Sequence, residues 1–410
     1  MLRTRTLIGA VAAGLLLAVA ACHNDELLRP AAITPVDPLF DRYVSMGNSI
    51  TAGFQSGGIN DSTQLQSYAV LLATQMHTPF FAPLMAQPGC PPPFTNIFTQ
   101  TRLAPIPCAL RKQQPTPLPY VSNVAVPGAE VMDAVSNLDT ASNANSLTTF
   151  FLGGLTQTQM MERAQPTFAS VWLGNNDVLG AATNAANAGD STKITTPALF
   201  QSRYTGVVDS LAAAGVEGAV LIGVVKVAAA PYFSQGQTYF AIKNGAVPGV
   251  AFPPTFTVAL NCAPRALGGQ GDSVLVPFPF GLGLLAAAAA GASDTLYCTE
   301  PQTIQPAELA KLGASVTAYN TIIQDLASAR GWAYWDPNPT LDSLRTIQTQ
   351  IAPFPNFGAP PAFTPCSASP FGLALSCDGI HPSAATHRLV ANKLIETINA
   401  KFGTNLTKVP

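Results

Sequence analysis

Short apolar runs alternate with helix-like stretches along most of this chain, and the alternation limits the folds that it can adopt. The run Gly218 to Val227 (GAVLIGVVKV) is apolar at nearly every position, as expected of a parallel strand covered on both faces. Four further runs are expected to be strands: Tyr43 to Met46, Tyr120 to Val126, Phe168 to Leu173 and Trp332 to Trp335. Together they predict an α/β chain, folded as a three-layer α/β/α sandwich around a five-stranded parallel sheet.

The stretches between these runs have helical spacing. The apolar positions of Ala384 to Phe402 fall on one side of a helix, as in an amphipathic helix that packs against a core. Helices are also expected over Gln64 to Met76, Pro197 to Ala214 and Ala307 to Arg330. Because ligands of such sheets bind at the carboxyl ends of the strands, functional residues are expected in the loops that follow strands.

Three residues with the chemistry of nucleophilic catalysis lie in loops of this kind. Ser49 follows the first strand, and Asp378 and His381 lie three residues apart near the end of the chain. A serine hydroxyl is a weak nucleophile until a histidine takes its proton, and the imidazole needs a carboxylate to fix its tautomer. We therefore predict Ser49 as nucleophile, His381 as base and Asp378 as the group that orients the base.

Two further loops offer hydrogen-bond donors for the oxyanion that acyl transfer forms. Gly128 follows the second predicted strand, and Asn176 follows the third. The backbone amides of Ser49 and Gly128 and the side-chain amide of Asn176 are the expected donors, since prearranged donors stabilise the charge in the transition state. Glycine lets the backbone approach the substrate without a Cβ in the way.

Ser, Gly, Asn and His in this order, at strand ends and on the final loop, resemble the SGNH (GDSL-type) hydrolase family over most of the chain. The matching blocks are GNSI at 47–50, GNND at 174–177 and DGIH at 378–381. The resemblance implies a flavodoxin-like fold, catalysis without a metal or organic cofactor, and the roles given above. Asn48 stands where the family has Asp, and we expect its side-chain oxygen to hold the turn.

Other polar residues near these blocks are expected to have structural roles. Asp177 should brace the loop of Asn176 rather than take part in chemistry. His387 should be a solvated residue on the surface of the last helix. The same is expected of His77 and His23.

Two regions exceed a minimal fold of this kind. Residues 229–305 form an insertion with a charge-free run at 274–291, which prolines and glycines interrupt and which is not expected to span a membrane. We expect the insertion to pack on the core, with a flexible lid or an acyl-binding wall as the alternative. Residues 77–119 form a second rim of the expected pocket. These loops would set the choice of substrate, and a pocket floored by Phe278 and Phe280 would favour acyl lipids.

The first residues have the zones of a bacterial lipoprotein signal. A 14-residue apolar run from Leu7 to Ala20 follows two arginines and leads through small residues to Cys22. We expect removal of residues 1–21, lipidation of Cys22, a tether over 22–38 and a hydrolase domain over 39–410, held in the outer membrane facing the periplasm or at the cell surface. An uncleaved membrane helix is the alternative, although the run is shorter than the about 20 residues that cross a bilayer.

The six remaining cysteines are expected to form disulfides, as is usual in an exported chain. Neighbours in sequence are the favoured pairs, because each pair brackets a stretch rich in Pro and Gly. These pairs are Cys90 with Cys108, Cys262 with Cys298 and Cys366 with Cys377. Sequence alone leaves other pairings open. A metal site is the rival interpretation, but no Cys-x-x-Cys pair is present.

Composition excludes one class of partner and leaves a choice of function. A net charge of −2 with 10% charged residues and no basic run gives no electrostatic footprint for nucleic acid. We expect an exported serine esterase or lipase that cleaves carboxylic esters, first of all those of acyl lipids, through an acyl-enzyme. An O-acetylesterase acting on acylated glycans is the alternative. A surface lipoprotein that binds a ligand without catalysis is the alternative from another class.

Overall fold

The computed structural model describes residues 34–105, 108, 111–112, 118–136, 150–247, 250–355 and 365–410. One compact unit runs from Pro35 to Pro410. The predicted signal peptide, Cys22 and most of the predicted tether lie outside the described residues. Val36, in the last part of the predicted tether, donates its backbone N–H to the carbonyl of Met76 at 3.1 Å, so the chain already contacts the domain at this position.

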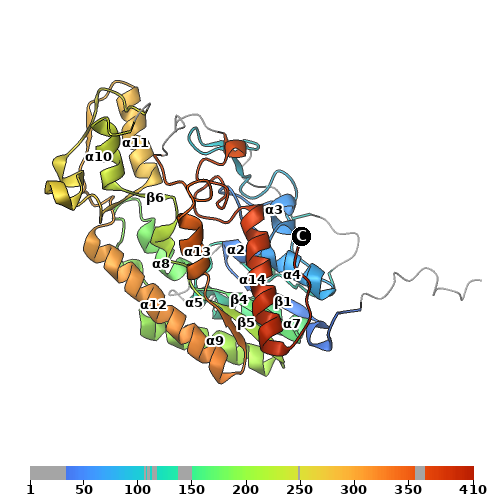
Figure 1. The fold of residues 1–410 in the computed structure, drawn as a ribbon. Coiled ribbons are helices and arrows are strands. Elements are labelled where there is room, and N and C mark those ends of the chain that lie inside the picture. The colour runs from blue at the N-terminus through green and yellow to red at the C-terminus, as the bar shows by residue number, and fades with distance from the viewer. Residues whose placement is uncertain are drawn as a thin grey trace, which may run out of the picture. The chain divides into compact units, whose positions relative to one another are not determined.

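A parallel sheet forms the centre of the fold (Figure 1). Its strands, in spatial order, are β1 (Tyr43–Gly47), β4 (Phe168–Trp172), β5 (Gly218–Ile222) and β10 (Ala333–Trp335). Every residue of β1, β4 and β5 is buried, because helices cover both faces of the sheet. The predicted α/β fold is confirmed, and double coverage explains why these runs are apolar without alternation.

The sheet has four strands among the described residues, and the prediction of a fifth was wrong. The predicted second strand, Tyr120 to Val126, does run parallel beside β1, and three backbone hydrogen bonds join it to Ser45 and Gly47. However, the N–H groups of Ser122 and Asn123 both bond to the carbonyl of Phe81. Successive N–H groups of a regular strand point to opposite sides, so this segment cannot be one. Its place beside β1 still gives the 2-1-3-4-5 order of flavodoxin-like folds.

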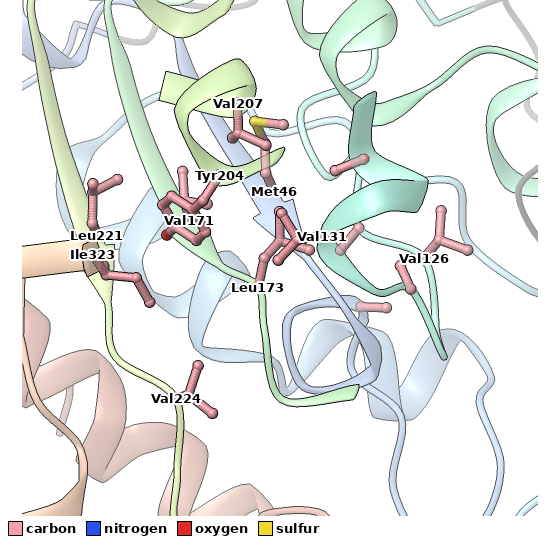
Figure 2. Packing of buried hydrophobic residues seen from close by; sticks show 14 of the residues in the cluster. Met46, Val126, Val131, Val171, Leu173, Tyr204, Val207, Leu221, Val224 and Ile323 are labelled. Atoms are coloured by element: carbon pink, nitrogen blue, oxygen red, sulfur yellow. The ribbon is translucent and has the colours of Figure 1, made fainter. Parts of the chain in front are cut away.

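Among the described residues, two long and two short helices cover one face of the sheet. They are α9 (Pro197–Ala213), α12 (Pro306–Ala329), α5 (Val131–Val135) and α7 (Gln157–Ala164). Figure 2 shows part of this core, in which Val171 and Leu221 from the strands belong to one buried cluster with Tyr204 and Val207 of α9 and Ile323 of α12. The sequence placed α9 and α12 to within one residue at each end.

The other face is covered by α4 (Tyr68–Met76) and α14 (Ala384–Phe402). The bounds of α14 are those predicted. The helix predicted from Gln64 begins later, because the Ser67 side chain caps α4 and separates it from a short preceding helix. Trp172 of β4 packs edge-on against Tyr68, with ring centroids 5.5 Å apart.

The predicted insertion forms a group of short elements with an apolar cluster of its own. They are β6 (Phe233–Gln235), α10 (Gly236–Lys243), β7 (Phe256–Val258), β8 (Leu275–Pro277), α11 (Phe278–Ala289) and β9 (Asp294–Leu296). In Figure 1, α10 and α11 lie together at the upper left of the ribbon. Phe278 stands at the centre of the cluster, where its ring packs edge-on against Phe354 and Phe371. Among the described residues, no helix is both long and apolar enough to cross a bilayer.

The remaining elements are short and lie mainly in the loops around the sheet. The helices are α2 (Ser49–Ala52), α3 (Asp61–Leu65), α8 (Asn176–Ala182) and α13 (Asn338–Arg345), and the strands are β2 (Phe94–Asn96) and β3 (Thr101–Arg102). Single 3-10 turns occur at Pro38–Phe40, Ser191–Lys193, Val227–Ala229, Leu260–Cys262, Arg265–Leu267 and Cys366–Ala368. The disulfides Cys90–Cys108, Cys262–Cys298 and Cys366–Cys377 confirm the predicted pairs.

Candidate active site

Ser49 is the first residue of α2, directly after the turn that ends β1. Asn48 caps this helix, since its Oδ1 accepts the N–H of Ile50 at 3.2 Å. The expectation that Asn48 holds the turn is therefore confirmed. A Cβ on Gly47 would overlap the side chain of Thr51, so only glycine fits at this position without displacing the helix.

A residue that sequence reasoning missed supports the same turn. Gln157, near the start of α7, accepts the N–H of Gly47 with Oε1 and donates to its carbonyl with Nε2, both at 2.9 Å. Gly47 is buried, and although its carbonyl also accepts the N–H of Val126, leaving its own N–H without a partner would be costly. No local pattern marks Gln157, which lies 110 residues from its partner.

The structure brings Ser49, His381 and Asp378 into one hydrogen-bonded chain. Nε2 of His381 lies 2.9 Å from Oγ of Ser49, and Nδ1 of His381 lies 2.8 Å from Oδ2 of Asp378. The imidazole also contacts the ring of Phe54, with centroids 4.9 Å apart. At these distances a serine can pass its proton to the histidine while the carboxylate holds the ring.

Asp378 is held by more than the histidine. Its Oδ1 accepts the N–H groups of Ile380 and His381 at 2.9 Å, and its Oδ2 accepts the N–H of Gly57 at 2.6 Å. Burial by itself would raise the pKa of Asp378, but the positive charge of protonated His381 and these hydrogen bonds lower it to about 2. The group is therefore a charged acceptor at neutral pH.

The loops of the two predicted oxyanion donors are bonded to one another. Nδ2 of Asn176 donates to the carbonyl of Ala129 at 2.8 Å, next to Gly128. A side-chain amide has two N–H donors, and this bond uses one of them. Gly128 lies exposed with φ 82°, a conformation that favours glycine. The structure thus places the two loops together, and the roles of Gly128 and Asn176 remain a prediction.

Three acidic residues lie behind this loop: Glu130, Asp133 and Asp177. Oδ2 of Asp177 accepts the N–H of Val131 at 3.0 Å, and Oδ2 of Asp133 accepts the N–H of Glu130 at 2.8 Å. Burial and repulsion by the other two carboxylates raise the pKa of Glu130 to about 7, and burial raises that of Asp133 to about 6. Burial also raises the pKa of Asp177. Asp177 therefore has a structural contact, in which it joins its own loop, that of Asn176, to the segment that follows Gly128.

Two cavities share His381 and Ile380 in their walls. The first, which we call the leucine cavity, has a volume of about 100 Å³ and contains Ser49 and Asn176 in its lining. Most of its other walls are apolar: Leu179, Val225, Val227, Trp335, Leu341, Leu344, Leu375, Leu389 and Val390. The nucleophile therefore opens into an apolar space.

The second, which we call the phenylalanine cavity, has a volume of about 620 Å³. Its lining includes His381 and Asp378 but not Ser49, and its other walls are Gly57, Phe94, Ile97, Phe98, Thr99, Gln100, Tyr232, Phe278, Pro279, Leu282, Gly283 and Ala286. A floor made of both Phe278 and Phe280 would favour acyl lipids, but only Phe278 lines this cavity, since Phe280 lines a separate one. The insertion thus forms a wall beside the triad.

The prediction that His387 is solvated was wrong. Its side chain is fully buried, and Nδ1 accepts the N–H of Tyr68 at 3.2 Å. Burial lowers the pKa of His387 to about 3, so the ring is neutral and joins α14 to α4. Its spacing of three, four and seven residues from Val390, Ala391 and Leu394 could have placed it on the apolar face.

In the part of the chain that the structure describes, no group of His, Cys, Asp or Glu could hold a metal ion.

Comparison with known proteins assigns a family and little more. The family model described as GDSL-like lipase/acylhydrolase matches residues 43–394. No curated protein matches the chain.

Among solved structures, the chain is similar to a mutant of Axe2, an acetyl-xylooligosaccharide esterase from Geobacillus, at 10% identity and TM-score 0.39, over 90% of this chain and 97% of the other. It is also similar to LAE5, an α/β hydrolase enzyme from the metagenome of Lake Arreo, at 14% identity and TM-score 0.37, over 90% and 99% of the two chains. Similarity at this level does not bear on the substrate.

Proposed function

Since the chain belongs to the family of GDSL-like lipases and acylhydrolases and is thus a serine ester hydrolase, we propose that Ser49 forms the acyl-enzyme. Oγ of Ser49 attacks the ester carbonyl while Nε2 of His381 takes its proton, and Asp378 stabilises the imidazolium that results. The C–O bond to the alcohol then breaks, and the departing alkoxide takes that proton from His381. Water attacks the acyl-enzyme by the same route and releases the acid.

The backbone N–H groups of Ser49 and Gly128 and Nδ2 of Asn176 would hold the oxyanion. The bond from Asn176 to Ala129 supports this role, because it fixes the amide at the loop of Gly128. Loss of one such donor commonly lowers kcat by about 10²- to 10³-fold.

One observation carries the choice of acyl group: Ser49 lines the leucine cavity, whose walls are mostly apolar. In the acyl-enzyme the acyl carbon is bonded to Oγ of Ser49, so the acyl chain begins in that cavity. Each methylene buried there stabilises the complex by about 0.8 kcal/mol. We therefore propose an esterase or lipase that cleaves esters of fatty or other apolar acids.

The second candidate is removal of O-acetyl groups from a glycan. The narrowness of the leucine cavity, about 100 Å³, favours a short acyl group and is the observation behind this alternative. The candidate from another class, a lipoprotein that binds a ligand without catalysis, is disfavoured by the intact bonds between Ser49, His381 and Asp378.

The test is to treat the protein, with the signal peptide and Cys22 removed, with a fluorophosphonate probe and to map the adduct by mass spectrometry. Hydrolysis of p-nitrophenyl esters from acetyl to palmitoyl is then measured. Labelling of Ser49 with highest kcat/KM beyond acetyl is expected, and Ser49→Ala should lose labelling and hydrolysis while keeping its circular dichroism spectrum. Highest kcat/KM on acetyl would favour the deacetylase. A folded protein that is neither labelled nor active, or a Ser49→Ala variant with full turnover, would refute the mechanism.

We propose that the enzyme is an exported lipoprotein, anchored through Cys22 in the outer membrane or at the cell surface. The support is the sequence alone, in which a basic start and an apolar run lead through small residues to this cysteine. Expression of the full chain in bacteria should give a membrane-bound protein whose first residue is an acylated Cys22. Cys22→Ala should prevent acylation and so abolish anchoring by the lipid. An unmodified Cys22 in the mature wild-type protein would refute the anchor.

A further inference from the structure

The phenylalanine cavity is not explained by the attack on the ester or by the acyl chain. It is the larger of the two cavities at the triad, and it touches His381 and Asp378 without touching Ser49. We infer that it binds the alcohol part of the ester, and that this alcohol is apolar, either a long alkyl or an aromatic group. This inference rests on the proposed ester hydrolysis and extends it to the other half of the substrate.

The order of bond changes assigns the two halves to the two cavities. In the proposed acyl-enzyme the acyl carbon is bonded to Ser49 and its oxygen would face Asn176; both residues line the leucine cavity. When the C–O bond breaks, the alcohol oxygen takes the proton from Nε2 of His381, which lines both cavities. The rest of the alcohol must extend away from Ser49, and the phenylalanine cavity is the space on that path.

The lining of this cavity suits an apolar group. Aromatic rings line both sides of the cavity: Phe98 and Tyr232 both contact Phe278, with their ring centroids 5.6 Å and 6.3 Å from that of Phe278. Apart from Asp378 and His381, no charged side chain of the described residues lines it, and apolar side chains outnumber the polar ones, which are Thr99, Gln100 and Tyr232 with its hydroxyl. A sugar would need several polar partners for its hydroxyl groups, because each buried hydroxyl without one costs free energy.

Both walls come from the regions outside the minimal fold. Pro279, Leu282, Gly283 and Ala286 follow one another at helical spacing along α11, so one face of this helix lines the cavity. The facing wall belongs to residues 94–100, next to Cys90, which is tied to Cys108. The choice of alcohol is therefore set by segments that do not hold the triad.

Gly283 offers a direct test. No heavy atom lies within 4 Å of a Cβ built at Gly283, and its backbone is helical, so a side chain added here extends into free space. Replacing a glycine within a helix also removes the conformational cost of glycine. Gly283→Leu should therefore fold and reduce the room for the alcohol. Gly313→Leu on α12 is the matched control, because Gly313 is also helical with open space at its Cβ and lines neither cavity.

The experiment measures kcat/KM on butyrate esters of methanol, hexanol, 1-naphthol and methyl glucoside. We expect the wild type to prefer the hexyl ester to the methyl and glucoside esters. Gly283→Leu should lower the naphthyl-to-methyl ratio by on the order of tenfold relative to wild type, whereas Gly313→Leu should leave it unchanged. Taking the ratio between variant and wild type cancels the different reactivities of the leaving groups.

Two results would overturn the inference. One is a naphthyl-to-methyl ratio that Gly283→Leu leaves at the wild-type value, and the other is a wild-type preference for the glucoside ester. Its failure is separable from failure of the proposed function, which would appear as no labelling of Ser49. With Ser49 labelled, Leu341→Trp serves as the complementary variant, since it should shift the acyl-length profile and not the alcohol ratio.

Discussion

At the level of single residues, the site depends on hydrogen bonds that fix which atom faces which. Both oxygens of Asp378 accept N–H groups of the backbone, and Oδ2 also faces Nδ1 of His381. An amide in place of this carboxylate would offer its N–H where an acceptor is required. The identity of residue 378 therefore decides the tautomer of His381, and with it whether Nε2 can take the proton of Ser49.

Asp378→Asn is predicted to lower kcat by on the order of 10⁴-fold with little change in KM, because the geometry is kept while the tautomer is wrong. Steady-state kinetics on one p-nitrophenyl ester would measure it. Asp209→Asn, in an exposed ion pair with Arg330, is the control and should behave as wild type. A fall of less than tenfold in the Asp378 variant would show that the carboxylate does not orient the base.

At the level of elements, the carboxyl group of Asp177 attaches the start of α5 to the start of α8, and Asp133 caps α5 from within. Asp177 holds the N–H of Val131, and Asp133 holds that of Glu130. The cations Arg203 and Lys193 lower the pKa of Glu130, though by less than burial and the two neighbouring carboxylates raise it. Burial and the negative charges of Asp177 and Glu130 also raise the pKa of Tyr319. Because the folded structure raises the pKa values of Glu130 and Asp133, protons bound to these two acids stabilise the folded state.

The sign of the resulting pH dependence follows from the raised pKa values. Glu130 and Asp133 titrate in the folded protein at about 7 and about 6, above their ordinary values, so the folded state binds more protons than the unfolded state between about pH 4 and 7. Their contribution to stability is fully present below about pH 4 and is lost as pH rises through 6 to 7. The slope is up to about 1.4 kcal/mol per pH unit for each proton.

Urea unfolding from pH 4 to 8 would measure this slope. Asp133→Asn should flatten this slope, because it removes one of the two titrating groups. The variant should still fold, since its amide oxygen can accept the N–H of Glu130. Asp325→Asn, on the exposed side of α12, is the control and should leave the slope unchanged. Equal slopes in the wild type and the Asp133 variant would contradict the prediction.

At the level of the whole molecule, disulfides hold the loops that surround a sheet formed without them. Cys262–Cys298 closes the insertion, Cys90–Cys108 closes the facing rim, and Cys366–Cys377 ends directly before Asp378. The walls of the phenylalanine cavity and the base loop are therefore tied down covalently, whereas the strands and long helices rely on packing.

Reduction is predicted to lower the melting temperature and to impair hydrolysis. Removing one native disulfide commonly costs about 2 to 5 kcal/mol in small secreted domains. Cys366→Ser combined with Cys377→Ser should lower kcat more than Cys262→Ser combined with Cys298→Ser, because only the first pair adjoins Asp378. Calorimetry with and without dithiothreitol, together with kinetics of both variants, would measure this. A melting temperature indifferent to reductant would count against the bonds.

The sequence by itself determined four strands of the parallel sheet, its long helices and the residues of the triad, and it favoured the cysteine pairs without excluding others. It could do so because each has a local signature: apolar runs for β1, β4 and β5, helical spacing for α14, and short motifs for Ser49 and His381. Tertiary structure decided the rest. In the segment before Gly128, the N–H groups of Ser122 and Asn123 bond to Phe81 and only later ones bond to β1, and Gln157 holds Gly47 across 110 residues. Two cavities arise where α11, α13 and distant loops converge on His381. Contacts of such separation have no local pattern, because they depend on which surfaces the folded chain brings together.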